Sequence, residues 1–226
     1  MQLTDGRAAP NERRLVEIVE EAWQSVNGLR VLEVGCGQGS ISVAFAERGA
    51  QPVCLDSAHR AVAHSLARHV RCGLPATGVT ASGFDIPLRS GSVDVVVSGG
   101  LLEHFPRELR QRMLAEMKRV SRGCVVALIP NGLDPFYRCA KWCLQQTGRW
   151  PWGEELSLPG LTEEFESVGM RVLHETSYDF HNSVQLFERA LALQREQAAA
   201  ILKWAAAEAR DEKWRGYRLV TIGTVT

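Results

Sequence analysis

The chain has 226 residues, of which 45% are hydrophobic and 23% are charged. Its 26 Lys and Arg residues balance its 26 Asp and Glu residues, so the formal net charge is zero. A chain of this length buries a sizeable core, and its neutral balance argues against a nucleic-acid or anionic-membrane partner. It contains no apolar run of membrane-spanning length and begins without the apolar core of a signal peptide, so we expect a cytoplasmic protein.

The first 130 residues predict an alternation of helices and strands. Apolar side chains recur at helical spacing over 11–26, 40–48, 57–71 and 107–121, and Asn11 and Ser57 are the expected N-caps of two of these helices. Short apolar runs predict strands over 30–34, 51–56, 77–81, 93–100 and 124–131. Such strands indicate a parallel sheet covered on both faces, hence a doubly wound α/β fold of the Rossmann-like type.

The pattern changes after the fifth strand. Residues 131–160 are rich in aromatic residues, Pro and Gly, and we interpret them as an insertion over the strand ends. A short helix over 161–169, with Thr162 as its N-cap, is followed by strands over 171–178 and 217–225. Between these strands, residues 183–210 predict one long helix. We expect a single domain over 1–226, with 11–130 as its ligand-binding core.

The six cysteines predict no metal site. Cys139 and Cys143 lie one helical turn apart, but no His or second Cys pair is nearby to complete a zinc site. Cysteines in apolar strands usually act as small hydrophobes. We therefore expect reduced, structural cysteines.

The stretch VLEVGCGQGS places Gly35, Gly37 and Gly39 where the first strand turns into a helix. Glycine admits positive φ and lets a ligand approach the main chain, and the N–H groups of a helix start attract anions. A nicotinamide or flavin fold favours G-x-G-x-x-G, but the third glycine here comes one residue early. A phosphate loop ending in Gly-Lys-Ser/Thr is absent from this stretch.

Several motifs together resemble the class I S-adenosylmethionine-dependent methyltransferases, and the type 11 group in particular. They are EVGCGQG after the first strand, the acid that ends VCLD, and FDIPLRSGSVDVVVSGGLLEHF. The resemblance continues more weakly through IPN, WPWGE and VGM, and it covers about residues 28–178. It implies a seven-stranded sheet with an antiparallel last strand, and S-adenosyl-L-methionine as the cofactor.

The resemblance also assigns cofactor-binding roles. The methionine part of the cofactor would contact the glycine turn and the end of the fourth strand, at Gly35, Cys36, Gly37, Gly39, Ser98 and Gly99. Glu33 would help order the turn and the ammonium group of the cofactor, through hydrogen bonds or water. Asp56, followed by Ser57, would accept hydrogen bonds from the ribose hydroxyls. The group usually has an Asp near the adenine where this chain has Ser82, so Ser82 and Gly83 are placed at the adenine edge, ahead of Asp85.

His104, in LLEHF, falls near the expected methyl group. It would act as a general base, or it would hold the loop together with Glu103 by hydrogen bonds. Tyr137, Trp150 and Trp152 would line an acceptor pocket, or they would pack the insertion onto the sheet.

The function predicted from the sequence is methyl transfer by in-line displacement, in which the protein mainly aligns the reactants. The acceptor would be a small or lipid-like molecule. Two alternatives remain open: a non-catalytic cofactor-binding partner protein that uses the long helix as an interaction surface, and a nicotinamide-dependent oxidoreductase. The sequence sets neither the acceptor atom nor the oligomeric state.

Overall fold

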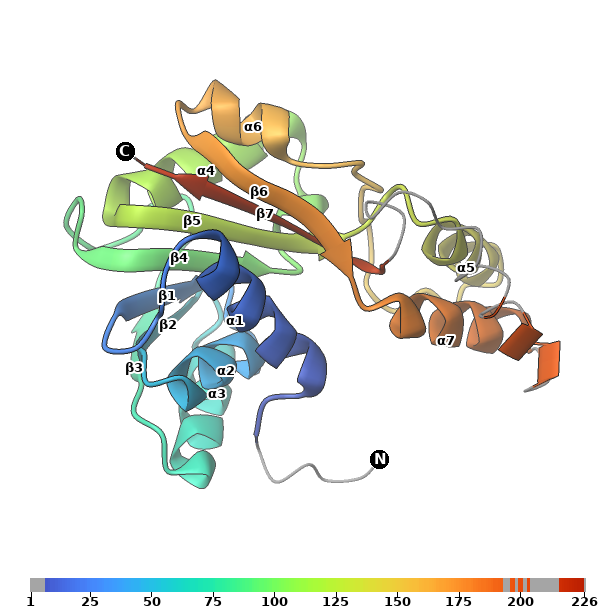
Figure 1. The fold of residues 1–226 in the computed structure, drawn as a ribbon, viewed down its shortest axis with the longest axis horizontal. Coiled ribbons are helices and arrows are strands. Elements are labelled where there is room, and N and C mark those ends of the chain that lie inside the picture. Colours follow the sequence, from blue (N-terminus) through green and yellow to red (C-terminus); the bar gives the residue numbers. More distant parts are fainter. Residues whose placement is uncertain (1–6, 193–195, 198, 201–202, 204–215, 226) are drawn as a thin grey trace.

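The structure, a computed structural model, describes residues 7–192, 196–197, 199–200, 203 and 216–225. It contains a seven-stranded sheet in the order β3-β2-β1-β4-β5-β7-β6 (Figure 1). The strands are β1 (Arg30–Val34), β2 (Gln51–Asp56), β3 (Thr77–Thr80), β4 (Val93–Gly99), β5 (Ser121–Pro130), β6 (Arg171–Tyr178) and β7 (Arg218–Thr224). β1 to β5 pair in parallel, whereas β7 is antiparallel to both β5 and β6. The predicted doubly wound, Rossmann-like α/β fold with an antiparallel last strand is confirmed.

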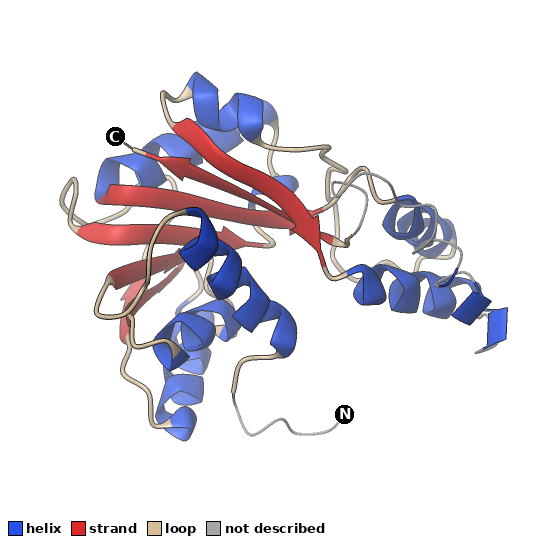
Figure 2. Cartoon of the chain, viewed as in Figure 1, coloured by secondary structure: helices blue, strands red, loops and turns tan. Residues whose placement is uncertain are grey.

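Helices cover both faces of the sheet (Figure 2). They are α1 (Pro10–Ala22), α2 (Ser40–Glu47), α3 (His59–Cys72), α4 (Arg107–Val120), α5 (Pro135–Gln146), α6 (Thr162–Ser167) and α7 (Phe180–Leu191), with a 3₁₀ turn, η1, at Leu102–His104. None of the helices in the described part of the chain is long and apolar enough to cross a membrane.

The alternation of side chains along each strand divides the core into two layers. Val95 and Val97 of β4 join one buried cluster with α1 and α2, whereas Val96 faces the other cluster with α4 and α6. Because both faces are buried, the central strands need apolar residues at every position, which is the pattern that the sequence displayed.

Three helices begin differently from the sequence prediction. Pro10 occupies the first turn of α1, whose N-cap is Ala9, so Asn11 lies inside the helix. The N-cap of α3 is Ala58, and the N-cap of α6 is Leu161 rather than Thr162.

Carboxylates from other elements satisfy the free N–H groups at two of these helix starts. Asp56 Oδ1 accepts from Ala58 N at 2.9 Å, and Glu175 Oε2 on β6 accepts from Leu161 N at 2.9 Å. Sequence rules for caps look within one segment, so they miss a cap supplied by a distant strand.

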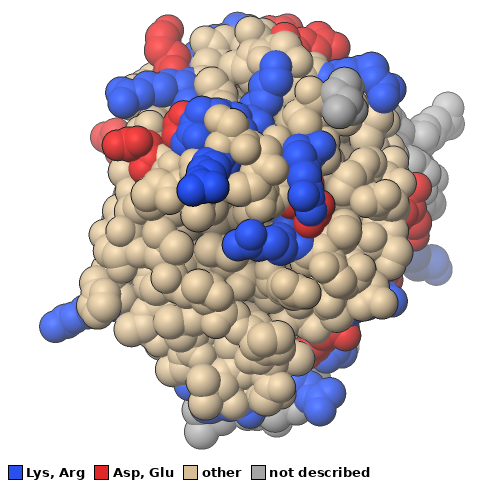
Figure 3. Space-filling model, turned by 90° about the vertical axis from the view of Figure 1, so that its left-hand side faces the viewer, with Lys and Arg blue, Asp and Glu red and all other residues tan. Residues whose placement is uncertain are grey.

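The predicted helix over 107–121 is α4, which is rich in Lys and Arg. Not all of these charged groups are solvated, because Arg110 is buried and pairs with Glu164 of α6 at 2.5 Å. On the side of the molecule in Figure 3, Lys and Arg gather in the upper half, with Asp and Glu among them. Elsewhere among the surface charges, exposed Arg122 forms an ion pair with Asp94 at 2.6 Å.

The segment over 131–160 contains α5, which the sequence analysis did not predict. Asp134 caps it by accepting from the backbone N–H groups of Phe136 and Tyr137, and Pro135 fills the first position. The ring of Phe136 packs edge-on against Phe180 and Phe187 of α7, so α5 and α7 lie side by side beyond the carboxyl end of β5 (Figure 1). The predicted helix over 183–210 begins as α7, and most of its remainder lies outside the described residues.

Candidate active site

The glycine turn connects β1 to α2 over the end of β2. Gly35, Gly37 and Gly39 adopt φ values of 72°, 49° and 68°, which favour glycine. The N–H groups of Gly35 and Cys36 both donate to Leu55 O, at 2.8 and 2.9 Å. The turn is therefore fixed to the neighbouring strand through its backbone.

Gly39 has a packing role as well. A Cβ at this position would lie 2.1 Å from Ser65 Oγ and 3.1 Å from Ser65 Cα, so only glycine lets α3 approach this closely. At Gly35 the space above the backbone is occupied by the side chain of Leu101, whose Cδ2 would be 3.1 Å from a Cβ.

Asp56 lies at the carboxyl end of β2, and its carboxylate bonds to the glycine turn and to the start of α3. Its Oδ2 accepts from Gly37 N at 3.1 Å, while Oδ1 accepts from Ala58 N. Each carboxylate oxygen has a second lone pair, so these two bonds leave acceptor capacity for a ligand.

A small cavity of about 120 Å³ opens beside Asp56. Five residues predicted to bind the cofactor come together in its wall: Gly35, Asp56, Ser57, Ser82 and Gly83. The rest of the wall is apolar and includes Phe84, Leu101, Phe105 and Met113. The sequence analysis did not predict this apolar part. Phe84 and Phe105 come from separate loops and meet edge-on at 5.3 Å between ring centroids.

Other predicted residues lie behind the cavity walls. Glu33 is 2% exposed, accepts from Ser42 N at 2.9 Å, and has its pKa raised to about 8 by burial. Cys36 is buried against Cys54 and Val62, and Ser98 is buried within β4. Their side chains support the turn and the strand ends.

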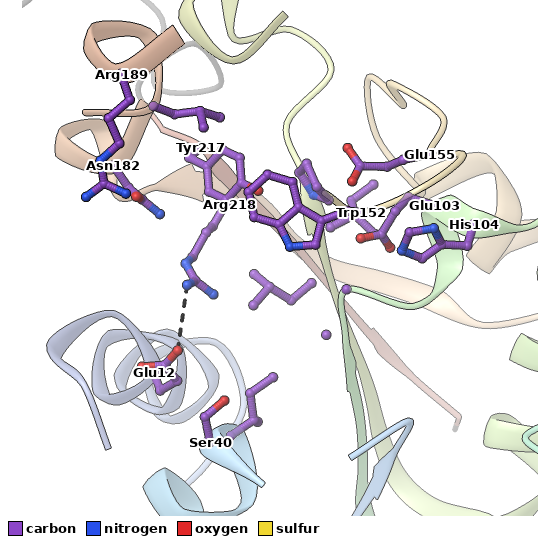
Figure 4. Close-up of a pocket in the computed structure, with 17 residues that line it drawn as sticks. Glu12, Ser40, Glu103, His104, Trp152, Glu155, Asn182, Arg189, Tyr217 and Arg218 are labelled. Atoms are coloured by element: carbon purple, nitrogen blue, oxygen red, sulfur yellow. Dashed lines mark ion pairs between the residues drawn. The ribbon is translucent and has the colours of Figure 1, made fainter. Parts of the chain in front are cut away.

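A larger cavity of about 400 Å³ lies at the carboxyl ends of β4 and β5 (Figure 4). Of the predicted residues, Gly99, His104 and Trp152 line it. The remaining lining residues come from α1, α2, the loop after β4 with η1, β5, α7, the start of β7 and the segment after α5. Gly100 belongs to this wall and Leu101 to the wall of the small cavity, so the loop after β4 separates the two spaces.

One end of the larger cavity is acidic. Glu103, His104 and Glu155 each place one ligand-type atom within 4.8 Å of the others. Glu103 is 2% exposed, and its buried Oε2 has no hydrogen-bond partner among the residues that the structure describes. Burial, reinforced by the charge of Glu155, raises the pKa of Glu103 to about 8.

His104 is exposed at this end, and its Nδ1 lies 2.7 Å from the carbonyl oxygen of Glu154. A carbonyl only accepts, so Nδ1 carries the hydrogen and Nε2 of the neutral ring keeps its lone pair. The same bond ties the loop after β4 to the segment after α5.

Tyr137 and Trp150 lie behind the acidic end and do not line the cavity. Tyr137 is fully buried, and its hydroxyl donates to the carboxylate of Glu155. Lys141 donates to Tyr137 Oη at 3.2 Å and pairs with Glu155 Oε1 at 3.3 Å. Trp150 packs edge-on against Trp152 at 4.7 Å. The sequence analysis missed Lys141 and Glu155, since a buried ion pair 14 residues apart leaves no local pattern.

The opposite end of the cavity is basic. Asn182, Leu186 and Arg189 line it from one face of α7, as their spacing of four and three residues requires. Arg218, at the start of β7, contacts Asp179 at 3.1 Å and Glu12 at 3.6 Å. The two ends therefore contain different ionisable groups, and Trp152 and Tyr217 lie between them (Figure 4).

Residues 31–123, from β1 into β5, match the family model described as "Methyltransferase domain". This part of the chain is therefore similar to methyltransferase domains. The match contains the glycine turn, Asp56 and the loop after β4, which are the segments that carried the resemblance in the sequence.

Two curated relatives are similar to part of this chain. An uncharacterized methyltransferase from Mycobacteroides abscessus is 29% identical over 60% of this chain and 60% of its own length. A ubiquinone biosynthesis O-methyltransferase from Bordetella avium is 31% identical over 55% of this chain and 48% of its own length. The chain therefore spans about half the length of the curated relatives it matches.

Solved structures share the fold of this chain over nearly its whole length. The magnesium protoporphyrin IX methyltransferase from Synechocystis, crystallised with bound SAH, superimposes with a TM-score of 0.63 at 14% identity. The alignment covers 95% of this chain and 81% of that one. At this identity the likeness shows a shared fold and no more.

Proposed function

We propose that this methyltransferase domain transfers a methyl group from S-adenosyl-L-methionine to a small-molecule acceptor held in the larger cavity. The observation that carries the proposal is the arrangement at the strand ends. A glycine turn and an acid at the tip of the next strand open onto one cavity, and a second cavity with acid–base side chains lies directly beyond it.

The residues around the small cavity fit this cofactor. The planar adenine suits the apolar wall of Phe84, Phe105 and Met113. Asp56 retains acceptor capacity for the ribose hydroxyls, with Ser57 beside it, and Ser82 and Gly83 border the adenine edge. The methionine part would lie along the backbone of the glycine turn toward Gly99. When bound, the cofactor supplies an electrophilic methyl group on a sulfonium.

The position of the Leu101 side chain suggests how the two cavities become continuous. Leu101 covers Gly35 and lies in the loop that separates the cavities. We infer that this side chain moves aside when the cofactor binds, since the cavity of about 120 Å³ is smaller than the adenosine group.

Side chains of the larger cavity would then bind and orient the acceptor. Trp152 and Tyr217 shape its apolar space and exclude water, while His104 Nε2 is free to receive a proton from a nucleophile. The Tyr137–Lys141–Glu155 group fixes the wall behind it. The O-methyltransferase name of one relative favours a hydroxyl acceptor, and the apolar lining favours a small or lipid-like molecule over a nucleic acid.

Cofactor binding is tested by calorimetry with S-adenosyl-L-methionine and NAD side by side. Asp56→Ala should weaken binding of S-adenosyl-L-methionine by roughly 10- to 100-fold, as expected for lost hydrogen bonds to a charged group. Asp85→Ala removes an exposed acid of the same region and serves as the matched control. Equal affinities for both variants, or preferential binding of NAD, would overturn the placement of the cofactor.

Catalysis is tested with cell extract, labelled methyl donor and mass spectrometry of the products. His104→Ala should lower kcat by roughly 100-fold or more if the ring acts as a base, with little change in cofactor affinity. A protein that binds the cofactor but labels no small molecule would instead support the non-catalytic alternative.

A further inference from the structure

The polarity of the larger cavity indicates the chemical class of its acceptor. The cavity has an acidic end at Glu103, an apolar and aromatic middle, and a basic end at Arg189 (Figure 4). Each end contains a polar group that the described part of the chain does not fully satisfy.

At the basic end, Arg189 is exposed to the cavity and makes no hydrogen bond or ion pair with any described residue. By contrast, the guanidinium of Arg218 is held by Asp179 and Glu12. Arg189 and Asn182 project from the same face of α7, two turns apart. A planar guanidinium next to an amide suits a carboxylate, which accepts two parallel N–H bonds.

At the acidic end, the unpartnered Oε2 of Glu103 is the decisive feature. Glu103 belongs to the cavity wall, and a buried carboxyl oxygen without a partner is costly. This oxygen is not exposed to the cavity, so the carboxyl has to turn toward the cavity before a ligand hydroxyl can bond to it and remove that cost. His104 lines the same space, and its Nδ1 bond to Glu154 O leaves Nε2 as the basic nitrogen of the neutral ring. A hydroxyl placed here would meet both an acceptor and a base.

The middle of the cavity sets the shape of the molecule between these ends. Its walls include Trp152 and Tyr217, with Leu186 and Ile129 completing the apolar lining. Rings favour planar, aromatic partners through stacked or edge-on contacts. A volume of about 400 Å³ admits one or two rings with short substituents.

Resting on the function proposed above, we propose that the acceptor is a hydroxylated aromatic acid. Its carboxylate pairs with Arg189 and Asn182, and its hydroxyl lies at Glu103 and His104. On transfer, the hydroxyl oxygen bonds to the methyl carbon and the hydroxyl proton passes to His104 Nε2. The electron pair of the broken carbon–sulfur bond stays on sulfur, so atoms and charge balance.

The test compares acids with neutral analogues. The probes are 3,4-dihydroxybenzoate, 3,4-dihydroxycinnamate and the methyl ester of each, with labelled methyl donor. We expect kcat/KM for at least one acid to exceed that of its ester by roughly 10- to 100-fold, the effect of a charge-assisted hydrogen bond. Equal turnover of acid and ester, or no methylation of any probe by protein that binds the cofactor, would overturn the acceptor class.

Substitutions of Arg189 test whether the preference for the acid over its ester comes from α7. Arg189→Met should abolish the preference for the acid, and Arg189→Glu should favour 3,4-dihydroxybenzylamine instead. Arg138→Met is the control, because Arg138 is an exposed arginine of α5 that does not line the cavity. Glu103→Gln should lower kcat/KM about 10-fold while leaving the acid-to-ester ratio unchanged. An acid preference that survives Arg189→Met would contradict the proposal.

Failure of this inference is distinguishable from failure of the proposed function. Calorimetry with S-adenosyl-L-methionine alone reports on the cofactor site, which none of these variants alters. Protein that does not bind the cofactor refutes the methyltransferase proposal itself, whatever the acceptor.

Discussion

The two cavities of this protein are built in different ways. The small cavity is formed by backbone turns and strand tips from short segments near 35, 56 and 83, and its polar residues follow directly from local motifs. The larger cavity collects side chains from Glu12 to Arg218, almost the full length of the chain. A site made of backbone geometry is visible in the sequence, whereas a site made of long-range side-chain contacts is not.

The largest loss of stability is expected at the buried Lys141–Glu155 ion pair behind the wall of the larger cavity. Lys141→Met leaves the Glu155 carboxylate buried without its cation and should lower the free energy of unfolding by about 3–5 kcal/mol. Urea denaturation measures this. Arg138→Met, one turn earlier on α5, should change stability by less than about 0.5 kcal/mol.

A double variant at this ion pair separates the cost of an unpaired charge from the cost of lost packing. Combining Lys141→Met with Glu155→Leu removes both charges and should recover most of the lost stability, since the uncompensated charge is the main cost. If the double variant is as unstable as the sum of the single variants, lost packing and not charge explains the effect.

The turn beside the small cavity should depend on the absence of a Cβ. Gly39→Ala should cost about 2–4 kcal/mol, because the left-handed backbone is strained and the new methyl overlaps Ser65. Gly37→Ala shares the positive φ but meets no atom within 4 Å, so only strain remains. Equal losses for the two variants would show that packing against α3 contributes nothing.

The smallest effect concerns pH. Glu103 binds its proton more tightly in the folded state, with a pKa of about 8, than in the unfolded chain. Between the unfolded pKa and pH 8 the folded state therefore holds more protons, and stability falls as pH rises. Glu103→Gln should remove this contribution, so its stability relative to the parent should rise by about 2 kcal/mol between pH 6 and pH 8.5.

Thermal and urea unfolding at both pH values measure this difference. Glu155→Gln at the same pH values tests the coupling, because the charge of Glu155 raises the pKa of Glu103. A relative stability of Glu103→Gln that is independent of pH would mean that the Glu103 carboxyl is ionised throughout this range.

The sequence alone determined the alternation of strands and helices, the glycine turn, the acid at the tip of β2 and the family resemblance. These features follow from local periodicity and from backbone conformations that few residues adopt. It also indicated Gly99, His104 and Trp152 as residues near the reacting end, although their roles remain proposals.

Only the tertiary structure decided which charged groups meet in the larger cavity. Lys141 and Glu155 pair across the turn after α5, Glu175 caps α6 from β6, and Arg189 reaches the cavity because α7 packs on α5. Each contact joins residues from separate elements, so its energy depends on burial and distance that no local pattern encodes. Tyr137 and Trp150 are a further example, because the sequence placed them near the acceptor but their packing places them behind the cavity wall.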